Sequence, residues 1–463
     1  MLLYQAKQGG RNTYRARRRT ESKRRLAPSR ARLSYSTRLI STSVHMRLLH
    51  TSDWHLGQTL HSYERTYEHQ CFLDWLLQAI VTEQADALLI AGDIFDTANP
   101  SAAAQKQLYR FLQQARERAP MLDIVVIAGN HDSPGRIEAP GPLLEAHGTS
   151  VIGHVVRGED GEIDIARHLV PLHDKFGAVK AWCLAIPFLR PGDVPRLPAA
   201  EEGAPVIDAY LGGISLLYQQ AYALAAARRL AGQSIVAMGH CHMVDGAASL
   251  ESERRIVIGG TEALPASIFD NAIAYAALGH LHLSQRVGQK EHLRYCGSPL
   301  PLSFSEVNYQ HQVLRIDLAD GAARSVTPLM VPRAVDLLRV PPQPAPLEEA
   351  LAALEALVLA DLPPHAQPYL EVRVLLDAPE PGLRGRIEAA IAGKPVRLAK
   401  IEPTRKHNAA GAAQSAMSLD QLAQLQPDDI FRRLYLQKFG DQAPDDQLTA
   451  FAELMLGAGE LGA

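Results

Sequence analysis

From Met46 onward, hydrophobic positions fall into two alternating patterns. Short apolar runs of strand length occur at Arg47–Thr51, Ala87–Ala91 and Ile124–Ala128. Between them, Tyr67–Glu83 and Ser101–Arg118 carry apolar residues at helical spacing. Strands that alternate with helices need crossover connections, so the pattern predicts an α/β fold with a sheet covered on both faces.

The same alternation continues to about residue 332. A long Ala- and Leu-rich helix is expected at Ala209–Leu230. Further short strands are predicted at Lys180–Pro187, Ser234–Met238, Arg255–Ile258, Ala274–Leu278 and Leu293–Cys296. A β-hairpin of Gln312–Asp317 and Ser325–Val331 is expected to close this first domain, residues 46–332.

The C-terminal third reads as a second unit and a tail. Dense prolines over Val331–Pro346 predict a linker. A small α/β module without evident chemistry is expected at 333–407, with elements at Leu347–Leu359 (helix), Tyr369–Leu376 (strand), Leu383–Ile391 (helix) and Val396–Ile401 (strand). Residues 408–463 hold an Ala/Gly/Ser-rich spacer and then helical segments, at Leu419–Leu425, Asp428–Phe439 and Asp445–Leu456. These helices suit either docking of a partner or a helical cap on the second unit, and both interpretations stay open.

Composition excludes some classes of protein. The 463 residues are 47% hydrophobic and 21% charged, which is ordinary for a globular chain, and no apolar run is long enough to span a bilayer. The four cysteines lie far apart without CxxC spacing, at Cys71, Cys183, Cys241 and Cys296. This spacing disfavours a disulfide framework and a thiolate zinc site, and it is typical of a reducing compartment.

Charge is distributed unevenly. Residues 1–45 hold 12 of the 47 Lys and Arg residues but only one of the 50 acids, so the remainder carries a net charge of −14. This leader could be a product of an upstream translation start, a disordered DNA-binding arm or an organelle transit peptide. The predicted fold therefore begins at Met46, after this leader. Any nucleic-acid binding by the acidic remainder would need a local basic stripe or metal ions.

Polar clusters follow the predicted strands directly. The clusters are Asp53-Trp-His55, Gly92-Asp93-Ile-Phe-Asp96, Gly129-Asn130-His131-Asp132, Gly239-His240 and Gly279-His280-Leu-His282. Ligand sites in α/β sheets form at the carboxyl ends of strands, so these clusters are expected to converge. The flanking glycines are expected to allow tight turns that aim the ligands at this edge.

The residue types indicate a pair of divalent cations. Aspartate, asparagine and histidine side chains without thiolates suit Mn, Fe or Zn better than a carboxylate-only Mg site. One aspartate could bridge two ions through its two oxygens, and such a pair stabilises both oxygens of an in-line phosphoryl displacement. Each motif alone could be an ordinary turn or a solvent-facing pair. Their order, always after a strand, favours a metal site.

The pattern DxH…GDxxD…GNHD…GH…GHxH resembles the calcineurin-like metallophosphoesterase signature. The longer strings HTSDWHLG, AGDIFDTA, GNHDS, ALGHLHLSQ and YCGSPLPLSF resemble the SbcD family of bacterial nucleases, from Met46 to about Val331. This resemblance implies a two-sheet α/β sandwich with a small α/β capping domain and C-terminal helices. It also implies a 3′–5′ double-strand exonuclease and single-strand or hairpin endonuclease. The expected partners are DNA, the SMC-like ATPase SbcC and a second copy of the chain.

The resemblance also implies a role for each site residue. One metal would be held by Asp53, His55, Asp93 and His282. The other would be held by Asp93, Asn130, His240 and His280, with Asp93 as the bridge and Mn²⁺ as the expected ion. His131 would be the catalytic imidazole, oriented by the carboxylate of Asp96, and water activated by the cations would be the nucleophile.

Three departures refine this expectation. The phosphatase strings GDxxDRG and GNHE, whose arginine clamps a phosphomonoester, are replaced by GDIFDTA and GNHDS, which favours a diester substrate. His242 is expected beside the metals or facing solvent rather than as a ligand. Gly297-Ser298-Pro299 could be a loop beside the site or a strand-ending turn. The alternative function is a small-molecule or nucleotide phosphodiesterase, and a non-catalytic scaffold is disfavoured because no ligand is missing.

Overall fold

A computed structural model describes residues 46–197, 208–244, 246–247, 263–378 and 380–405, together with four isolated positions, 435, 444, 447 and 448. The basic leader and the predicted strand Arg255–Ile258 lie outside the described residues, as do the predicted C-terminal helices apart from positions 435, 447 and 448.

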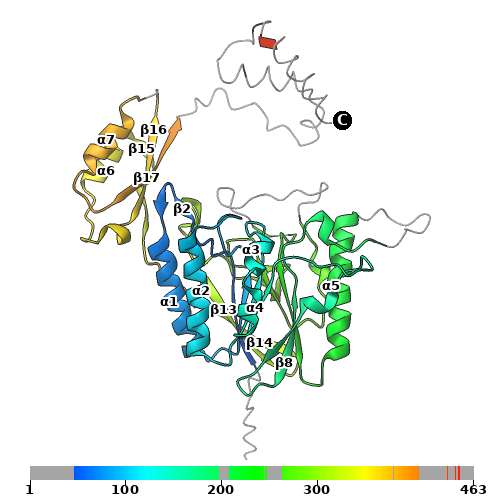
Figure 1. The fold of residues 1–463 in the computed structure, drawn as a ribbon. Coiled ribbons are helices and arrows are strands. Elements are labelled where there is room, and N and C mark those ends of the chain that lie inside the picture. Colours follow the sequence, from blue (N-terminus) through cyan, green and yellow to red (C-terminus); the bar gives the residue numbers. More distant parts are fainter. Residues whose placement is uncertain are drawn as a thin grey trace, which may run out of the picture. The chain divides into compact units, whose positions relative to one another are not determined.

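The first of two six-stranded sheets joins the early predicted strands to the hairpin predicted to close the domain (Figure 1). Its order is β14 (Ala322–Met330), β13 (Gln312–Ala319), β1 (Met46–Thr51), β4 (Ala87–Ala91), β5 (Asp123–Ile127) and β6 (Thr149–Ile152). Strands β1, β4, β5 and β6 are parallel, and β13 joins β1 antiparallel. Helices α1 (Thr66–Thr82) and α2 (Ala102–Arg118) pack their apolar residues on its outer face. The Ser101 side chain caps α2 by accepting a hydrogen bond from the Ala104 amide.

The second sheet carries the later strands. Its order is β11 (Gln285–Val287), β12 (Lys290–Tyr295), β10 (Tyr275–Gly279), β9 (Ser234–His240), β8 (Val179–Ala185) and β7 (Leu169–His173). Helix α5 (Ala209–Arg228) covers its outer face and is capped by Asp208. In Figure 1, α5 lies on the opposite side of the two sheets from α1 and α2.

The inner faces of the two sheets pack against each other. Their shared core includes Leu48, Leu89 and Val125 from the first sheet, with Val236 and Ala277 from the second. The expected two-sheet sandwich is confirmed, and each sheet is covered on both faces as predicted, by helices on the outer face and by the other sheet on the inner face. A strand buried on both faces has the same apolar run whether a helix or another sheet covers it, so the pattern could not distinguish them.

Short elements connect the main ones. A two-stranded ribbon is formed by β2 (Thr59–Leu60) and β3 (Tyr63–Glu64). Two short helices, α3 (Pro134–Glu138) and α4 (Gly141–Glu145), precede β6. Single 3₁₀ turns occur at η1 (Ile165–His168), η2 (Pro191–Asp193), η3 (Ala266–Ile268), η4 (Phe304–Glu306) and η5 (Pro364–Ala366).

The described residues between 337 and 405 form a three-stranded parallel sheet with two helices. The strands are β15 (Leu337–Pro346), β16 (Tyr369–Leu376) and β17 (Arg397–Arg405), and the helices are α6 (Leu347–Glu355) and α7 (Leu383–Ala390). The linker predicted at Val331–Pro346 is therefore wrong over its second half. Pairing of β15 with β16 skips from Val340 to Ala345, so the intervening prolines, which lack an N–H, interrupt an edge strand at an irregularity.

Candidate metal centre

Strands of both sheets end at one place. Asp53 and His55 follow β1, Asp93 follows β4, and Asn130 and His131 follow β5. From the second sheet, His240 ends β9, while His280 and His282 follow β10. The structure gathers the acids and histidines among them into groups whose possible ligand atoms lie within 4.8 Å of one another. Asp53/His55/His282 and Asp93/His240/His280 are fully buried groups, and His55/Asp93/His131 is a third, in which His131 is half-buried.

Asp93 lies between the two groups. Its Oδ2 is 3.6 Å from His55 Nε2 and 3.4 Å from His240 Nε2. Its Oδ1 accepts a hydrogen bond of 2.8 Å from the His131 amide. A single oxygen of Asp93 therefore faces both groups, whereas the sequence suggested one oxygen for each.

Asn130 belongs to the second group. Its Oδ1 is 3.0 Å from His240 Nε2 and 3.1 Å from His280 Nδ1. The amide oxygen thus points at the ring nitrogens that would share a cation with it.

The carboxylates and imidazoles of the centre shift one another's pKa values. Burial raises the pKa of Asp53, and His240 and His282 oppose this shift. Burial disfavours a charged His240, but the Asp93 carboxylate outweighs it and raises the His240 pKa to about 9. Burial and the neighbouring His240 lower the pKa of His280 to about 3.

The chemistry of these donors fits divalent cations. His55 is 2% exposed, and its Nε2 has no hydrogen-bond partner among the described residues. A buried polar atom without a partner is costly, and a cation between His55, Asp53 and Asp93 would satisfy it.

The backbone at four of the predicted ligands is left-handed. The φ angles are 54° at Asp53, 47° at His55, 49° at Asp93 and 102° at His280. Non-glycine residues rarely adopt this region, and such strain clusters at functional sites. Hydrogen bonds of 3.0 Å from the Asp53 amide to Gly92 O and from the His55 amide to Asp93 O hold the first turn.

The flanking glycines serve mainly to make room. Among the four expected to allow tight turns, Gly92 has a positive φ, of 89°. A Cβ on Gly129 would lie 2.1 Å from Asp93 Oδ1, and one on Gly279 would lie 1.9 Å from the Ala91 carbonyl oxygen. Gly129 and Gly279 are thus required by close packing rather than by turn conformation.

Two buried acids behind the centre were given no role by the sequence. The Asp132 carboxylate accepts hydrogen bonds from the amides of Ile94, Phe95 and Gly129, at 3.1, 3.0 and 2.8 Å. It thereby joins the turns after β4 and β5, and burial and Asp93 raise its pKa to about 6. Glu306 Oε1 lies 2.8 Å from His282 Nδ1. The Glu306 contact is of the kind that orients a ligand imidazole, whereas Asp132 holds backbone turns. Asp132 is visible in the sequence as the final Asp of GNHD, and no motif signals Glu306.

His131 and Asp96 meet differently from the expected contact. His131 Nδ1 lies 2.8 Å from the backbone carbonyl oxygen of Asp96. The Asp96 carboxylate instead lies 3.3 Å from His55 Nδ1. Burial favours the neutral form of Asp96, but this hydrogen bond and the charges of His55, His131 and His69 together lower its pKa. The rings of His131 and His55 are 4.8 Å apart and nearly perpendicular.

Two further predicted features lie beside the centre. The His242 ring is 6.3 Å from the His280 ring, with its Nε2 3.5 Å from Gly246 O. The Gly297-Ser298-Pro299 loop contacts a predicted ligand, because the Ser298 amide donates to His282 O at 3.1 Å. This contact favours the loop beside the site over a simple strand-ending turn.

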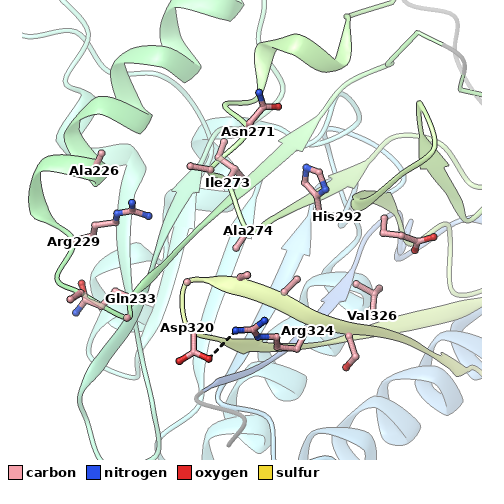
Figure 2. Close-up of a pocket in the computed structure, with 18 of the residues that line it drawn as sticks. Ala226, Arg229, Gln233, Asn271, Ile273, Ala274, His292, Asp320, Arg324 and Val326 are labelled. Carbon is pink, nitrogen blue, oxygen red and sulfur yellow. Dashed lines mark hydrogen bonds and ion pairs between the residues drawn. The ribbon is translucent and has the colours of Figure 1, made fainter. Parts of the chain in front are cut away.

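A cavity of about 860 Å³ lies elsewhere, at the amino ends of β9 and β10 and the β13–β14 turn (Figure 2). Its charges are mixed, with Arg229 and Arg324 beside Glu291 and Asp320. Arg324 pairs with Asp320 at 2.9 Å, as the dashed line in Figure 2 marks. None of the predicted site residues lines it.

Comparison with known proteins agrees with this geometry. Residues 46–284 match the calcineurin-like phosphoesterase family model, and residues 333–439 match a model described as the type 5 capsule protein repressor C-terminal domain. None of the described helices has the length and apolar character needed to cross a membrane.

Three curated relatives carry one name, that of the SbcD component of the nuclease SbcCD. The Rhodobacter capsulatus protein is 44% identical over 377 residues, covering 81% of this chain and 91% of its own. The Escherichia coli K12 protein is 34% identical over 405 residues, covering 86% and 94%. The Bacillus subtilis protein is 37% identical over 278 residues, covering 60% and 67%. The chain therefore belongs to the SbcD family of calcineurin-like phosphoesterases, and it is a nuclease that hydrolyses phosphodiester bonds.

Proposed function

We propose that this nuclease cuts DNA with two divalent cations, Mn²⁺ being the expected ion. The observation that carries the proposal is the position of Asp93 Oδ2, which faces His55 Nε2 at 3.6 Å and His240 Nε2 at 3.4 Å. One buried carboxylate oxygen between two histidine groups is the arrangement that a bridged metal pair requires.

The two groups would divide the predicted ligands between them. Asp53, His55 and His282 would hold one cation together with Asp93. Asn130, His240 and His280 would hold the other, again with Asp93. When bound, the pair would lower the pKa of water to supply the nucleophile and would offset the charge that develops on the phosphate.

His131 would be the catalytic acid. Because the Asp96 carbonyl can only accept, the contact at 2.8 Å fixes the His131 proton on Nδ1 and leaves Nε2 as the atom that exchanges a proton. His131 would protonate the leaving 3′ oxygen or stabilise the phosphorane. Asp96 would act as a positioning residue, through its carbonyl on His131 and its carboxylate on His55.

Two observations favour DNA over a small phosphoester. Thr97 follows Asp96, where the phosphatase pattern has the arginine that clamps a phosphomonoester. The relatives, which match this chain over most of their own length, are named as nucleases. Exonuclease action from 3′ to 5′ on duplex ends and endonuclease action on hairpins are the finer activities we propose. A nucleotide phosphodiesterase is the alternative.

The name that the relatives share denotes one part of a complex, SbcCD. We propose that the chain works with the SMC-like ATPase SbcC, as a homodimer within a heterotetramer. The C-terminal segment 408–463, of which the structure describes only positions 435, 444, 447 and 448, is the proposed docking element. The four free cysteines suit a reducing cytoplasm.

The test is a cleavage assay with Mn²⁺ and duplex or hairpin DNA, with and without the ATPase, alongside a cyclic-nucleotide substrate. Wild-type protein is expected to cut DNA, and His131→Ala is expected to be about 10²–10⁴-fold slower while binding Mn²⁺ normally. Absence of DNA cleavage both with and without the ATPase, or full activity of His131→Ala, contradicts the mechanism. Cleavage of the cyclic nucleotide alone would support the alternative.

A further inference from the structure

The segment Pro301–Val307, which contains η4, is held through its backbone carbonyls. From the first domain, Arg65 donates to Pro301 O at 2.7 Å and Gln58 to Leu302 O at 2.9 Å. From the C-terminal module, Arg339 donates to Phe304 O at 2.5 Å and Arg333 to Val307 O at 2.8 Å. The segment therefore depends on side chains from both parts of the chain.

Apolar contacts join the same two parts. Phe304 is fully buried in a cluster with Leu60 of the first domain and with Val335, Leu337 and Tyr369 of the module. Burying an aromatic side chain removes its apolar surface from water and so stabilises the contact that buries it. The module thus supplies much of the surface that keeps η4 in place.

A buried ion pair reinforces this contact. Arg65 is 1% exposed and pairs with Glu68 through two hydrogen bonds of 3.1 and 2.6 Å. The Tyr369 hydroxyl donates to Glu68 Oε1 at 2.7 Å. Arg397 of β17 stacks on the Tyr369 ring at 3.8 Å. Loss of the module would leave a buried carboxylate short of a donor, which is costly.

On its other side, η4 touches the metal centre. Glu306 is fully buried, and its Oε2 accepts from the Leu302 amide at 2.7 Å while its Oε1 lies 2.8 Å from His282 Nδ1. The orientation of the His282 ring therefore follows the position of η4.

We infer that the module at 333–405 controls one metal group by clamping η4, with Glu306 as the positioning residue for His282. Arg339 is the central link between the module and η4. Its guanidinium pairs with Glu371, a buried acid of β16, at 2.7 Å and also donates to Phe304 O. The inference rests on the proposed function only in taking His282 as a metal ligand. A partner that moves the module would then change metal occupancy directly.

The test is Mn²⁺ titration by calorimetry on the full chain without DNA. His282→Ala identifies which of the two expected binding events belongs to the His282 group. Arg339→Gln and Glu306→Gln are each expected to weaken that event by about 10-fold or more and to leave the other unchanged. The double variant is expected to lose no more Mn²⁺ affinity at that event than the single variant with the larger loss, because both substitutions act through Glu306.

Arg373→Gln is the matched control, because Arg373 lies on the neighbouring strand and donates to Pro342 O instead of η4. The exposed Arg333→Gln tests the same link with less risk to folding and is expected to act in the same direction. Wild-type affinity at both events in Arg339→Gln and Arg333→Gln would overturn the inference. Equal weakening by Arg373→Gln would also overturn it. A wild-type chain that binds two Mn²⁺ but cuts no DNA would instead reject the proposed function and leave this inference standing.

Discussion

The His131 amide donates a hydrogen bond of 2.8 Å to Asp93 Oδ1. Through this contact the turn after β5 decides which oxygen Asp93 presents to the centre. With Oδ1 occupied by the backbone, Oδ2 faces His55 and His240 together. The proposed bridge between the two groups thus depends on the relative position of neighbouring strands.

Replacing Asp93 with asparagine is expected to weaken both metal groups at once. The variant loses the negative charge that faces both histidines, and DNA cleavage in Mn²⁺ is expected to fall by about 10³-fold, or several kcal/mol. Mn²⁺ titration and a cleavage assay would measure this. Asp74→Asn, at an exposed position of α1, is the control and should behave as wild type. Loss of only one binding event in Asp93→Asn would argue against a shared oxygen.

Gly129→Ala is expected to disturb the centre through space alone. Its added Cβ would lie 2.1 Å from Asp93 Oδ1 and must displace that carboxylate. We expect Mn²⁺ affinity to fall by about 10-fold or more at both events. Gly135→Ala, where an added Cβ meets nothing within 4 Å, should bind Mn²⁺ normally. Unchanged affinity in Gly129→Ala would show that the turn relaxes without moving Asp93.

Removal of divalent cations is expected to lower the melting temperature. The buried carboxylates of Asp53 and Asp93 lie close together, and cations bound only to the native state add about 2.7 kcal/mol per site at 100 times Kd. Thermal unfolding with chelator and with increasing Mn²⁺ would measure the effect. The His282→Ala variant should show roughly half of the stabilisation that Mn²⁺ gives to wild type. A melting temperature independent of Mn²⁺ would count against a metal pair in this centre.

Acid is expected to destabilise the protein partly through His50. Burial lowers the His50 pKa from 6.5 to about 3, while its Nδ1 lies 2.8 Å from the Tyr275 hydroxyl. Between pH 6.5 and 3 the unfolded chain binds a proton that the native state does not, so the free energy of unfolding falls as pH falls. The loss from this residue at pH 5 is about 2 kcal/mol relative to pH 7.

Denaturant unfolding in chelator at pH 7 and pH 5 would test this. His50→Gln keeps a hydrogen-bonding group but cannot titrate, so its stability should fall by about 2 kcal/mol less than that of wild type. His147→Gln, at an exposed position, serves as the control and should follow wild type. The same loss in His50→Gln as in wild type would remove His50 as a cause.

Much of the fold was predictable because its signals are local. Runs such as Ala87–Ala91 and Tyr369–Leu376 match β4 and β16 residue for residue, since strand length and apolar continuity are properties of a few neighbouring positions. The edge strand β15 was missed because prolines usually mark a linker, and only its pairing with β16 reveals a strand.

By itself, the sequence determined which polar side chains follow which strands, because each ligand motif is adjacent to the strand that delivers it. Asp53 after β1, Asp93 after β4 and His280 after β10 could each be placed at the carboxyl end of a strand without coordinates. Only the tertiary structure decided that the second face of each sheet meets the other sheet, that Asp96 meets His131 through its carbonyl, and that Glu306 supports His282. These contacts join residues far apart in the chain or depend on which atom of a residue faces its neighbour, and no periodicity records either.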